Sequence, residues 1–312
     1  MDEKMQTVKT TGALPVLIKR NVKLFFKDKG TFLTALITPM ILLILYVLFL
    51  YDVYESSFMQ AFPPELGISE ETLKPIMKGL VGGILVSSLL AVSTVTVSCC
   101  ANLFIVQDRA SGVRRDMDTT PTKSNTLAVG YFVSTVINGM LISTIATLLG
   151  FIYLACTGWY LSAGDILKLF LDVLLLVSFG TALSSLLFFS LKTQGQASAV
   201  GTMISSTYGF LCGAYMPISQ YGVAFRNVLA FFPGVYGTSL MRNHALAGVY
   251  REMVEKGLPE AVIGGVRDMS DCNLYFFGDP VKELYMYLAL IGATLVLTGI
   301  YILLHSLASK KR

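Results

Sequence analysis

The sequence predicts an all-α membrane protein with six transmembrane helices. The first observation is composition: 54% of the 312 residues are apolar and only 14% are charged, whereas soluble domains average about 25% charged residues. The second is length, because several uncharged segments exceed the roughly 20 residues that a helix needs to cross a bilayer. The third is that the charges gather in short islands between those segments.

Six apolar segments are expected to span the membrane. They cover residues 32–51, 80–106, 127–155, 173–191, 197–216 and 284–307. A seventh segment, 223–240, is interrupted by Arg226 and by Pro233-Gly234. A short, broken apolar segment is typical of a re-entrant or interfacial hairpin, because non-helical backbone at membrane depth must be enclosed by protein.

The basic residues predict the orientation. Fifteen of the 24 Lys and Arg residues lie in four segments on one side of a six-span topology: 1–31, 107–125, Lys192 and 310–312. Because cytoplasmic loops are enriched in Lys and Arg, both termini are expected in the cytoplasm and the protein in the cell membrane. The net charge of +4 is explained by contact with anionic membrane lipid, so no nucleic acid partner is expected.

The long connections at about 52–78 and 241–283 are expected on the outer side. The second carries many acids and exceeds an ordinary connection, so it is predicted to form an ordered cap. Cys272 lies in this cap, where an exposed thiol would be either free or paired with its twin across a dimer.

Residues 1–30 are predicted to form an amphipathic helix ahead of a membrane domain at 31–312, with a break at Gly30-Thr31. Its basic residues recur every four positions on one face: Lys19, Lys23 and Lys27. Apolar residues occupy roughly the opposite face: Leu14, Ile18, Val22 and Phe25. This pattern is typical of a helix in the inner interface. It leaves open whether the helix is only an anchor or also docks a partner through these lysines and Arg20.

Residues 107–121 form a charged, turn-rich island between two segments without a charge, 81–106 and 127–155. Such an island must lie in water at one membrane face, because both flanking segments are long enough to span the bilayer. It is a place where a soluble partner can act on the membrane part. The pattern therefore favours a transport machine over a simple anchor.

The sequence lacks the motifs of ATP binding, metal binding and catalysis. No P-loop motif G-x-x-x-x-G-K-[ST] is present, so this chain is not expected to bind ATP in that way. His244 and His305 have no partners at metal-ligand spacing, and no metal or catalytic site is expected. Asp172 is interpreted as lying at headgroup level, which leaves ion-coupled transport without an intramembrane relay.

Hydroxyls and small residues crowd the second and fifth spans. Helix packing explains such residues, because they permit close approach and hydrogen bonds between helices. The alternative is that these spans face a translocation path or a dimer seam. The candidates for that role are Ser93, Thr94, Thr202, Ser205, Ser206 and Tyr208.

The charged island and the segment after the fifth span resemble the ABC-2 type (type V) exporter permeases. The first likeness is Gln107-Asp108-Arg109-Ala110-Ser111-Gly112 with Thr120-Pro121, followed by Gly130 near the start of the third span. The second is Gly213-Ala214-Tyr215-Met216-Pro217 and then Phe232-Pro233-Gly234-Val235-Tyr236. Gln107, Ala110 and Arg114-Arg115 depart from the usual pattern, which suggests a different choice of partner.

The resemblance implies an exporter of a hydrophobic or amphipathic drug, lipid or peptide. A separate ATPase subunit would hold ATP and magnesium, and a second permease chain would complete a homo- or heterodimer. The residues implied in coupling are Gln107, Asp108, Arg109, Gly112, Arg114, Arg115, Thr120 and Pro121. Those implied in the re-entrant segment are Pro217, Pro233, Gly234 and Tyr236. A receptor or immunity factor that binds a ligand at the outer cap, or a secondary carrier, remains the alternative.

Overall fold

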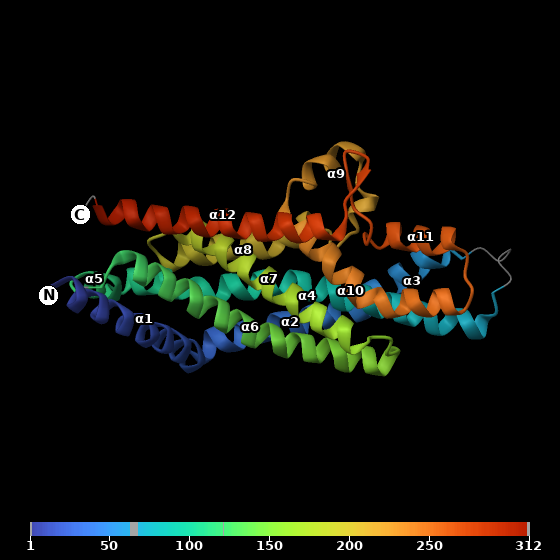
Figure 1. The fold of residues 1–312 in the computed structure, drawn as a ribbon. Coiled ribbons are helices and arrows are strands. Elements are labelled where there is room, and N and C mark those ends of the chain that lie inside the picture. Colours follow the sequence, from blue (N-terminus) through green and yellow to red (C-terminus); the bar gives the residue numbers. More distant parts are fainter. Residues whose placement is uncertain (1, 63–67, 121, 311–312) are drawn as a thin grey trace.

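The computed structural model describes residues 2–62, 68–120 and 122–310. It is an elongated bundle of helices with one small hairpin (Figure 1). The helices are α1 (Asp2–Lys27), α2 (Lys29–Leu45), a π-helical turn (Tyr46–Leu50), α3 (Tyr51–Met59), α4 (Glu70–Ala110), α5 (Val113–Asp118), α6 (Ser124–Thr157), α7 (Ala163–Phe188), α8 (Gln194–Leu211), a 3-10 turn (Ile218–Gln220), α9 (Val223–Leu229), α10 (Pro233–Glu255), α11 (Glu260–Met269) and α12 (Glu283–Lys310). The antiparallel hairpin pairs β1 (Tyr275–Phe276) with β2 (Asp279–Pro280).

Helix α4 is the central element of the bundle. It packs against α2, α6, α7, α8 and α10, and its most apolar window is entirely buried. A helix that is apolar on all sides is stable only when surrounded by other elements. Glycines allow neighbouring helices to approach α4 closely. A Cβ on Gly83 would be 2.5 Å from Leu246 Cδ2 on α10, and a Cβ on Gly180 of α7 would be 2.9 Å from the Val95 Cα.

Among the residues that the structure describes, five helical segments are long and apolar enough to cross a membrane: 29–59, α4, α6, α7 and 283–308. These correspond to five of the six predicted spans. The other predicted span coincides with α8, which has 18 residues and begins with polar side chains, Gln194 and Gln196. Helix α8 does not satisfy the same test, so its crossing of the membrane stays a prediction.

The two long outer connections contain more helix than the sequence predicts. Most described residues of 52–78 belong to α3 and to the start of α4. The 41 residues of α4 measure about 60 Å at 1.5 Å per residue, which exceeds the ~30 Å hydrocarbon core. Helix α10 continues through residue 241, the expected start of the cap, to Glu255, and most of its residues are buried.

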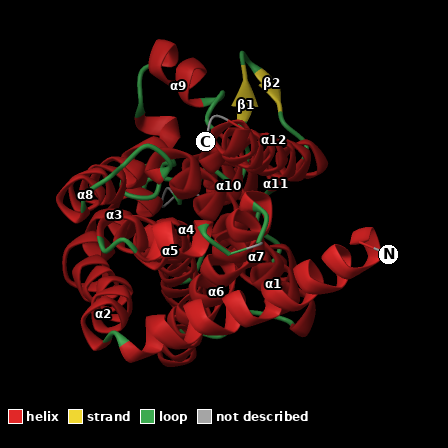
Figure 2. Cartoon of the chain, turned by 90° about the vertical axis from the view of Figure 1, so that its left-hand side faces the viewer, coloured by secondary structure: helices red, strands yellow, loops and turns green. Residues whose placement is uncertain are grey.

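The two ends of the chain lie at the same end of the bundle. Figure 1 shows the N-terminus, α5 and the C-terminus together at the left, whereas α11 and the start of α4 lie at the right. Figure 2 views the molecule from the end that carries α5 and the termini. The predicted topology requires both termini and the charged island to lie on the same side, and the structure has them at the same end. We call this end the α5 end.

Candidate functional site

The charged island folds into a tight turn followed by a short helix. Helix α4 ends at Ala110, and Gly112 has a φ of 85°, a left-handed conformation that costs glycine little. Helix α5 then runs for six residues. Thr119 and Thr120 close it with side-chain hydrogen bonds of 2.7 Å to carbonyls of its last turn. Pro121 lies outside the described residues.

Asp108 is buried and joins three helices. Its carboxylate accepts hydrogen bonds from Arg20 Nη1 at 2.8 Å and Arg20 Nη2 at 3.1 Å. The Tyr131 hydroxyl of α6 donates to the same carboxylate. The hydrogen bonds that Arg20 donates to Asp108 raise the pKa of Arg20 above its ordinary value, so this guanidinium is charged. Arg20 therefore points into the protein rather than outward with the lysines of α1.

Arg109 caps the end of α7. Its Nη1 donates to the carbonyl oxygens of Phe188 at 2.8 Å, Phe189 at 2.6 Å and Leu191 at 3.1 Å. The last carbonyls of a helix lack partners within it and carry a partial negative charge, so a cation there is favourable. Asp108 and Arg109 thus fix the start of the island to α1, α6 and α7.

Other charges of the island face outward. Arg115 and Asp116 are exposed on α5. Arg114 is partly buried, with Nε 3.2 Å from Asp118 Oδ1 and Nη2 3.3 Å from Ser124 Oγ. Gln107 is half-buried. A polar pocket of about 380 Å³ lies behind α5; among its lining residues are Arg109, Arg114, Asp118, Phe189 and His305.

Helix α1 lies along α6 beside the island. Its inward positions are Leu17, Asn21 and Phe25. Leu17 packs so closely on Gly130 that a side chain there has no room, and Asn21 Nδ2 donates to Ser134 Oγ at 3.2 Å. The exposed basic positions are those predicted from the sequence: Lys19, Lys23 and Lys27.

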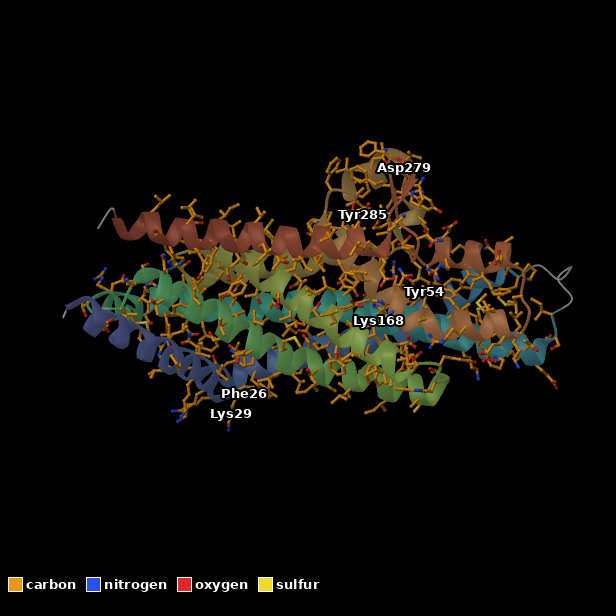
Figure 3. The ribbon with its side chains drawn as sticks, viewed as in Figure 1. Phe26, Lys29, Tyr54, Lys168, Asp279 and Tyr285 are labelled. Carbon is orange, nitrogen blue, oxygen red and sulfur yellow. The ribbon has the colours of Figure 1, made fainter. Side chains whose placement is uncertain are left out.

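The predicted apolar stripe of α1 is displaced. Of its four residues only Phe25 is buried, because the contact with α6 is centred on Leu17 and Asn21. The helix ends earlier than Gly30, since Asp28 caps α2 by accepting from the Thr31 N–H at 3.2 Å. Phe26 and Lys29 point away from the bundle at this corner (Figure 3).

The hydroxyls of the second and fifth spans have different surroundings. Ser93 and Thr94 are fully buried in α4 and donate to carbonyls of their own helix, so they line no surface of this chain. On α8, by contrast, Thr202 and Ser206 are exposed and Ser205 is half-buried. Tyr208 points inward, with its ring centroid 5.8 Å from that of Phe232.

The segment between α8 and α10 folds back on itself, as the resemblance implies. The chain turns at Gly213, whose φ is 76°, and Pro217 precedes the 3-10 turn. After α9, Pro233 occupies the first turn of α10, where its missing N–H is not needed. Gly234 leaves room for Tyr208, because a Cβ would be 2.8 Å from that hydroxyl. The Tyr236 hydroxyl donates to the Ala230 carbonyl.

A buried ion pair holds the segment between α8 and α10 in its folded-back conformation. Asp271 accepts from the backbone N–H groups of Ile218 and Ser219 and pairs with Arg242 Nη1 at 2.8 Å. Arg242 is fully buried, and its Nη2 also donates to the Gly213 carbonyl at 2.6 Å. Arg242 belongs to a Leu240-Met241-Arg242 run that also resembles the family's re-entrant segment, but the sequence does not reveal its partner, because the two residues lie 29 positions apart with no shared motif.

The sequence model of ABC-2 type transporters matches residues 13–245. This range covers most of the chain and includes the second half of α1, the charged island, α8 and the folded-back segment. The chain belongs to the ABC-2 type transporter family. No curated protein matches the sequence. The protein is therefore the helical membrane component of a transport system.

Beyond the family motifs, this ABC-2 permease contains a buried His–carboxylate cluster. His244 Nδ1 lies 2.6 Å from Asp172 Oδ2, and Nε2 lies 3.0 Å from Glu283 Oε1. The Tyr287 hydroxyl donates to Asp172 at 3.1 Å. Burial lowers the pKa of His244, but the hydrogen bonds and charges of the two carboxylates outweigh burial and raise it. Asp172 is only 1% exposed and is enclosed by protein, while its place at headgroup level stays a prediction.

Cys272 is likewise buried in this permease rather than exposed in a cap. It is 2% exposed, and its Sγ lies 3.4 Å from the Tyr250 hydroxyl and 3.3 Å from Ser270 Oγ. Burial raises the pKa of the thiol, which lowers its reactivity. The cysteine is free, and its position inside the fold removes the basis for a disulfide to a second chain.

Proposed function

We propose that this chain is the permease subunit of an ATP-driven exporter for a hydrophobic or amphipathic substrate. A separate ATPase subunit binds the α5 end, which faces the cytoplasm, and holds ATP and magnesium. A second permease chain completes the pathway. The proposal rests on the family, on the missing P-loop and on the way in which the charged island is built into the bundle.

The observation that carries the proposal is the anchoring of α5. Its exposed face offers Arg115 and Asp116 to a partner, while Asp108 and Arg109 tie the start of the island to α1, α6 and α7. A displacement of α5 is therefore transmitted to α1, α6 and α7, and also to α4, because α4 leads directly into the turn before α5. A loop that only connected two spans would need no such anchoring.

The lysine face of α1 extends this docking surface. Lys19, Lys23 and Lys27 are exposed on a helix whose Arg20 is bound to Asp108. A partner that contacts both α1 and α5 would thus act on a single unit. The basic face also suits anionic lipid of the inner leaflet.

We further propose that α8 faces the translocation path or the seam with the second chain. Ser198, Thr202 and Ser206 recur every four residues on its exposed face. Helix α8 also exposes Met203 and Phe210, but this row of hydroxyls has no counterpart at Ile41 of α2 or Leu295 of α12, whose large exposed apolar side chains suit lipid. Ser93 and Thr94 are enclosed within the chain and are not part of the proposed face.

Copurification tests the proposed assembly. The chain is expressed with a candidate ABC ATPase from the same genome, and the complex is isolated through a tag on the permease. We expect two permease and two ATPase chains, with ATP hydrolysis only when the ATPase is present. Arg115→Glu should weaken the complex because it reverses an exposed charge, whereas Lys256→Glu at the far end should not.

The receptor and carrier alternatives predict other outcomes. A receptor would show no bound ATPase and would bind its ligand without transport. A carrier would move substrate in vesicles that contain the permease alone. Transport that requires the ATPase and ATP contradicts both alternatives.

A further inference from the structure

The segment α9 and the β1–β2 hairpin form a lobe on the side of the bundle. We call residues 218–230 and 271–281 the side lobe; it protrudes beside the start of α12 in Figure 1. Its surface carries large exposed apolar and aromatic side chains: Val223, Phe225, Val228, Tyr275, Phe276 and Phe277. An apolar patch of this kind indicates a binding surface or contact with a membrane.

The side lobe lies at the level where a membrane-crossing helix begins. The hairpin ends at Pro280, and the apolar span 283–308 follows directly. Residues at the start of such a span lie among the lipid headgroups. Exposed Phe and Val side chains at that level are typical of segments that enter the interface.

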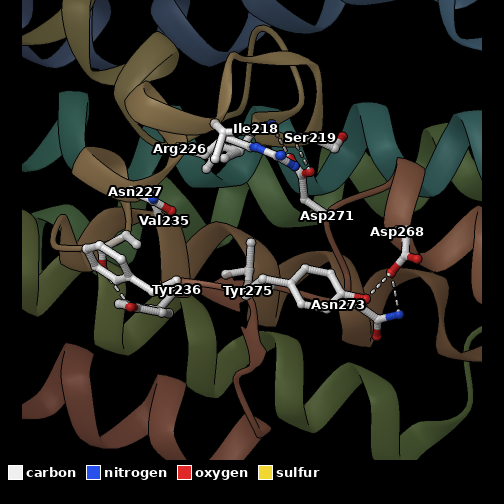
Figure 4. A pocket seen from close by; sticks show the side chains of 15 residues that line it. Ile218, Ser219, Arg226, Asn227, Val235, Tyr236, Asp268, Asp271, Asn273 and Tyr275 are labelled. Carbon is white, nitrogen blue, oxygen red and sulfur yellow. Dashed lines mark hydrogen bonds between the residues drawn. The ribbon is translucent and has the colours of Figure 1, made fainter.

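The lobe encloses a pocket of about 460 Å³ (Figure 4). Known ligand pockets measure about 300–1,000 Å³ and combine apolar walls with a few polar groups. The apolar wall here includes Ile218, Val223, Ala230, Val235 and Leu274. Tyr236, Tyr275 and Phe277 add aromatic surface. This lining suits a hydrocarbon chain.

One cation of the pocket lining is available to an anion. Asp271 is bound by two backbone N–H groups and Arg242. Asp268 is engaged by neutral donors, accepting from Asn273 Nδ2 at 2.9 Å and from the Tyr275 hydroxyl at 3.0 Å. Within the described ranges, the half-buried Arg226 side chain has neither a hydrogen bond nor an ion pair. The guanidinium of Arg226 is therefore the group of the lining that an anionic head would contact.

We infer that the side lobe binds an amphiphile with an anionic head and a hydrocarbon chain, at the membrane interface. The chain occupies the apolar wall of the pocket, and Arg226 contacts a carboxylate or phosphate head with charge-assisted hydrogen bonds. Such a molecule reaches the pocket from the adjacent leaflet, as an anionic phospholipid or a fatty acid. This site is separate from α5 and α8 and does not depend on the proposed ATPase partner.

Photolabelling of the full-length permease in nanodiscs tests this inference. The probes carry a diazirine in the same acyl chain and differ in the head: phosphatidylglycerol, phosphatidylcholine and a free fatty acid. Peptides from 218–236 and 271–278 are then analysed by mass spectrometry. We expect labelling by phosphatidylglycerol, the fatty acid or both, which identifies the head. Inorganic phosphate should not compete, because it lacks a chain.

Point variants distinguish binding in the pocket of the side lobe from non-specific contact with lipid. Arg226→Gln should lower labelling by the anionic probes about tenfold, which is the scale of one hydrogen bond to a charged group, and Arg226→Lys should restore much of it. Val223→Trp should fill the pocket and reduce labelling without removing a charge. Lys256→Gln, an exposed cation outside the lobe, is the matched control. Equal labelling by phosphatidylcholine, no labelling of the lobe, or no effect of Arg226→Gln and Val223→Trp would overturn the inference.

Discussion

Three long-range pairs, one partly buried and two buried, fix the geometry of the permease at the residue scale. Arg20–Asp108, Arg242–Asp271 and His244–Asp172 join residues that are 88, 29 and 72 positions apart. Sequence reasoning found the individual charges but not the partners, because no local pattern links positions so far apart. A lone buried charge is costly, so each pair depends on both members.

Asp271→Asn should destabilise the permease strongly. The substitution keeps the side-chain shape but leaves the fully buried Arg242 charge uncompensated, and such a loss costs roughly 3–5 kcal/mol. Thermal unfolding in detergent measures the effect. Asp279→Asn on the exposed hairpin is the control. Equal melting temperatures for the two variants would show that the pair does not hold the folded-back segment.

The stabilising effect of His244 should depend on pH. Its folded-state pKa is raised above the roughly 6.5 of an unfolded histidine. The stabilisation is therefore fully present below that value and is lost as pH rises through the folded pKa. His244→Gln should lower the melting temperature more at acid than at alkaline pH. A difference that is constant with pH, or larger in alkali, would mean that protonation of His244 does not stabilise the fold.

At the scale of single elements, α1 shows where periodicity succeeds and where it fails. The lysine face is exposed as predicted, but the buried face is centred on Leu17 and Asn21 rather than on the predicted stripe. Exposed Val16 and Phe26 add apolar surface elsewhere on the helix. Which apolar side faces the bundle is decided by the partner helix, and the contact of Leu17 with Gly130 is not visible in α1 alone.

Gly130→Leu should therefore detach α1 while leaving the bundle folded. The new side chain occupies the space of Leu17, and the contact of α1 with α6 opens. We expect faster tryptic cleavage after Lys19 and Lys23 in purified protein. Gly264→Leu on α11, where a Cβ would have no neighbouring atom within 4 Å, is the control. Unchanged cleavage would mean that α1 is held by other contacts.

At the scale of the whole molecule, the sequence predicted the helical class, six spans, of which five are long and apolar enough to cross a membrane, and the family. These features follow from local composition and short motifs. It did not predict that α10 enters the core, because its moderately polar sequence resembles that of an outer segment. It also missed the burial of Asp172 and Cys272, since burial is decided by helices that pack from other parts of the chain.

The orientation of the whole molecule is testable by surface labelling. In a Cys156→Ser background, which removes an exposed thiol, Lys256→Cys should react with an impermeant maleimide in intact cells. Ser111→Cys should react only after the membrane is opened, because the α5 end is assigned to the cytoplasm. Labelling of position 111 in intact cells would reverse the assignment.

The central claim is that α5 transmits the action of an ATPase to the membrane helices, and Gly112→Val tests it most directly. A side chain at a left-handed φ costs about 1–3 kcal/mol and misdirects α5. Gly257→Val is the matched control, because Gly257 has a φ of 73°, also with open space, at the opposite end. ATP hydrolysis and substrate efflux are measured in vesicles that contain the complete complex. We predict that Gly112→Val abolishes efflux or uncouples it from hydrolysis while Gly257→Val transports normally; wild-type efflux by Gly112→Val would contradict the claim.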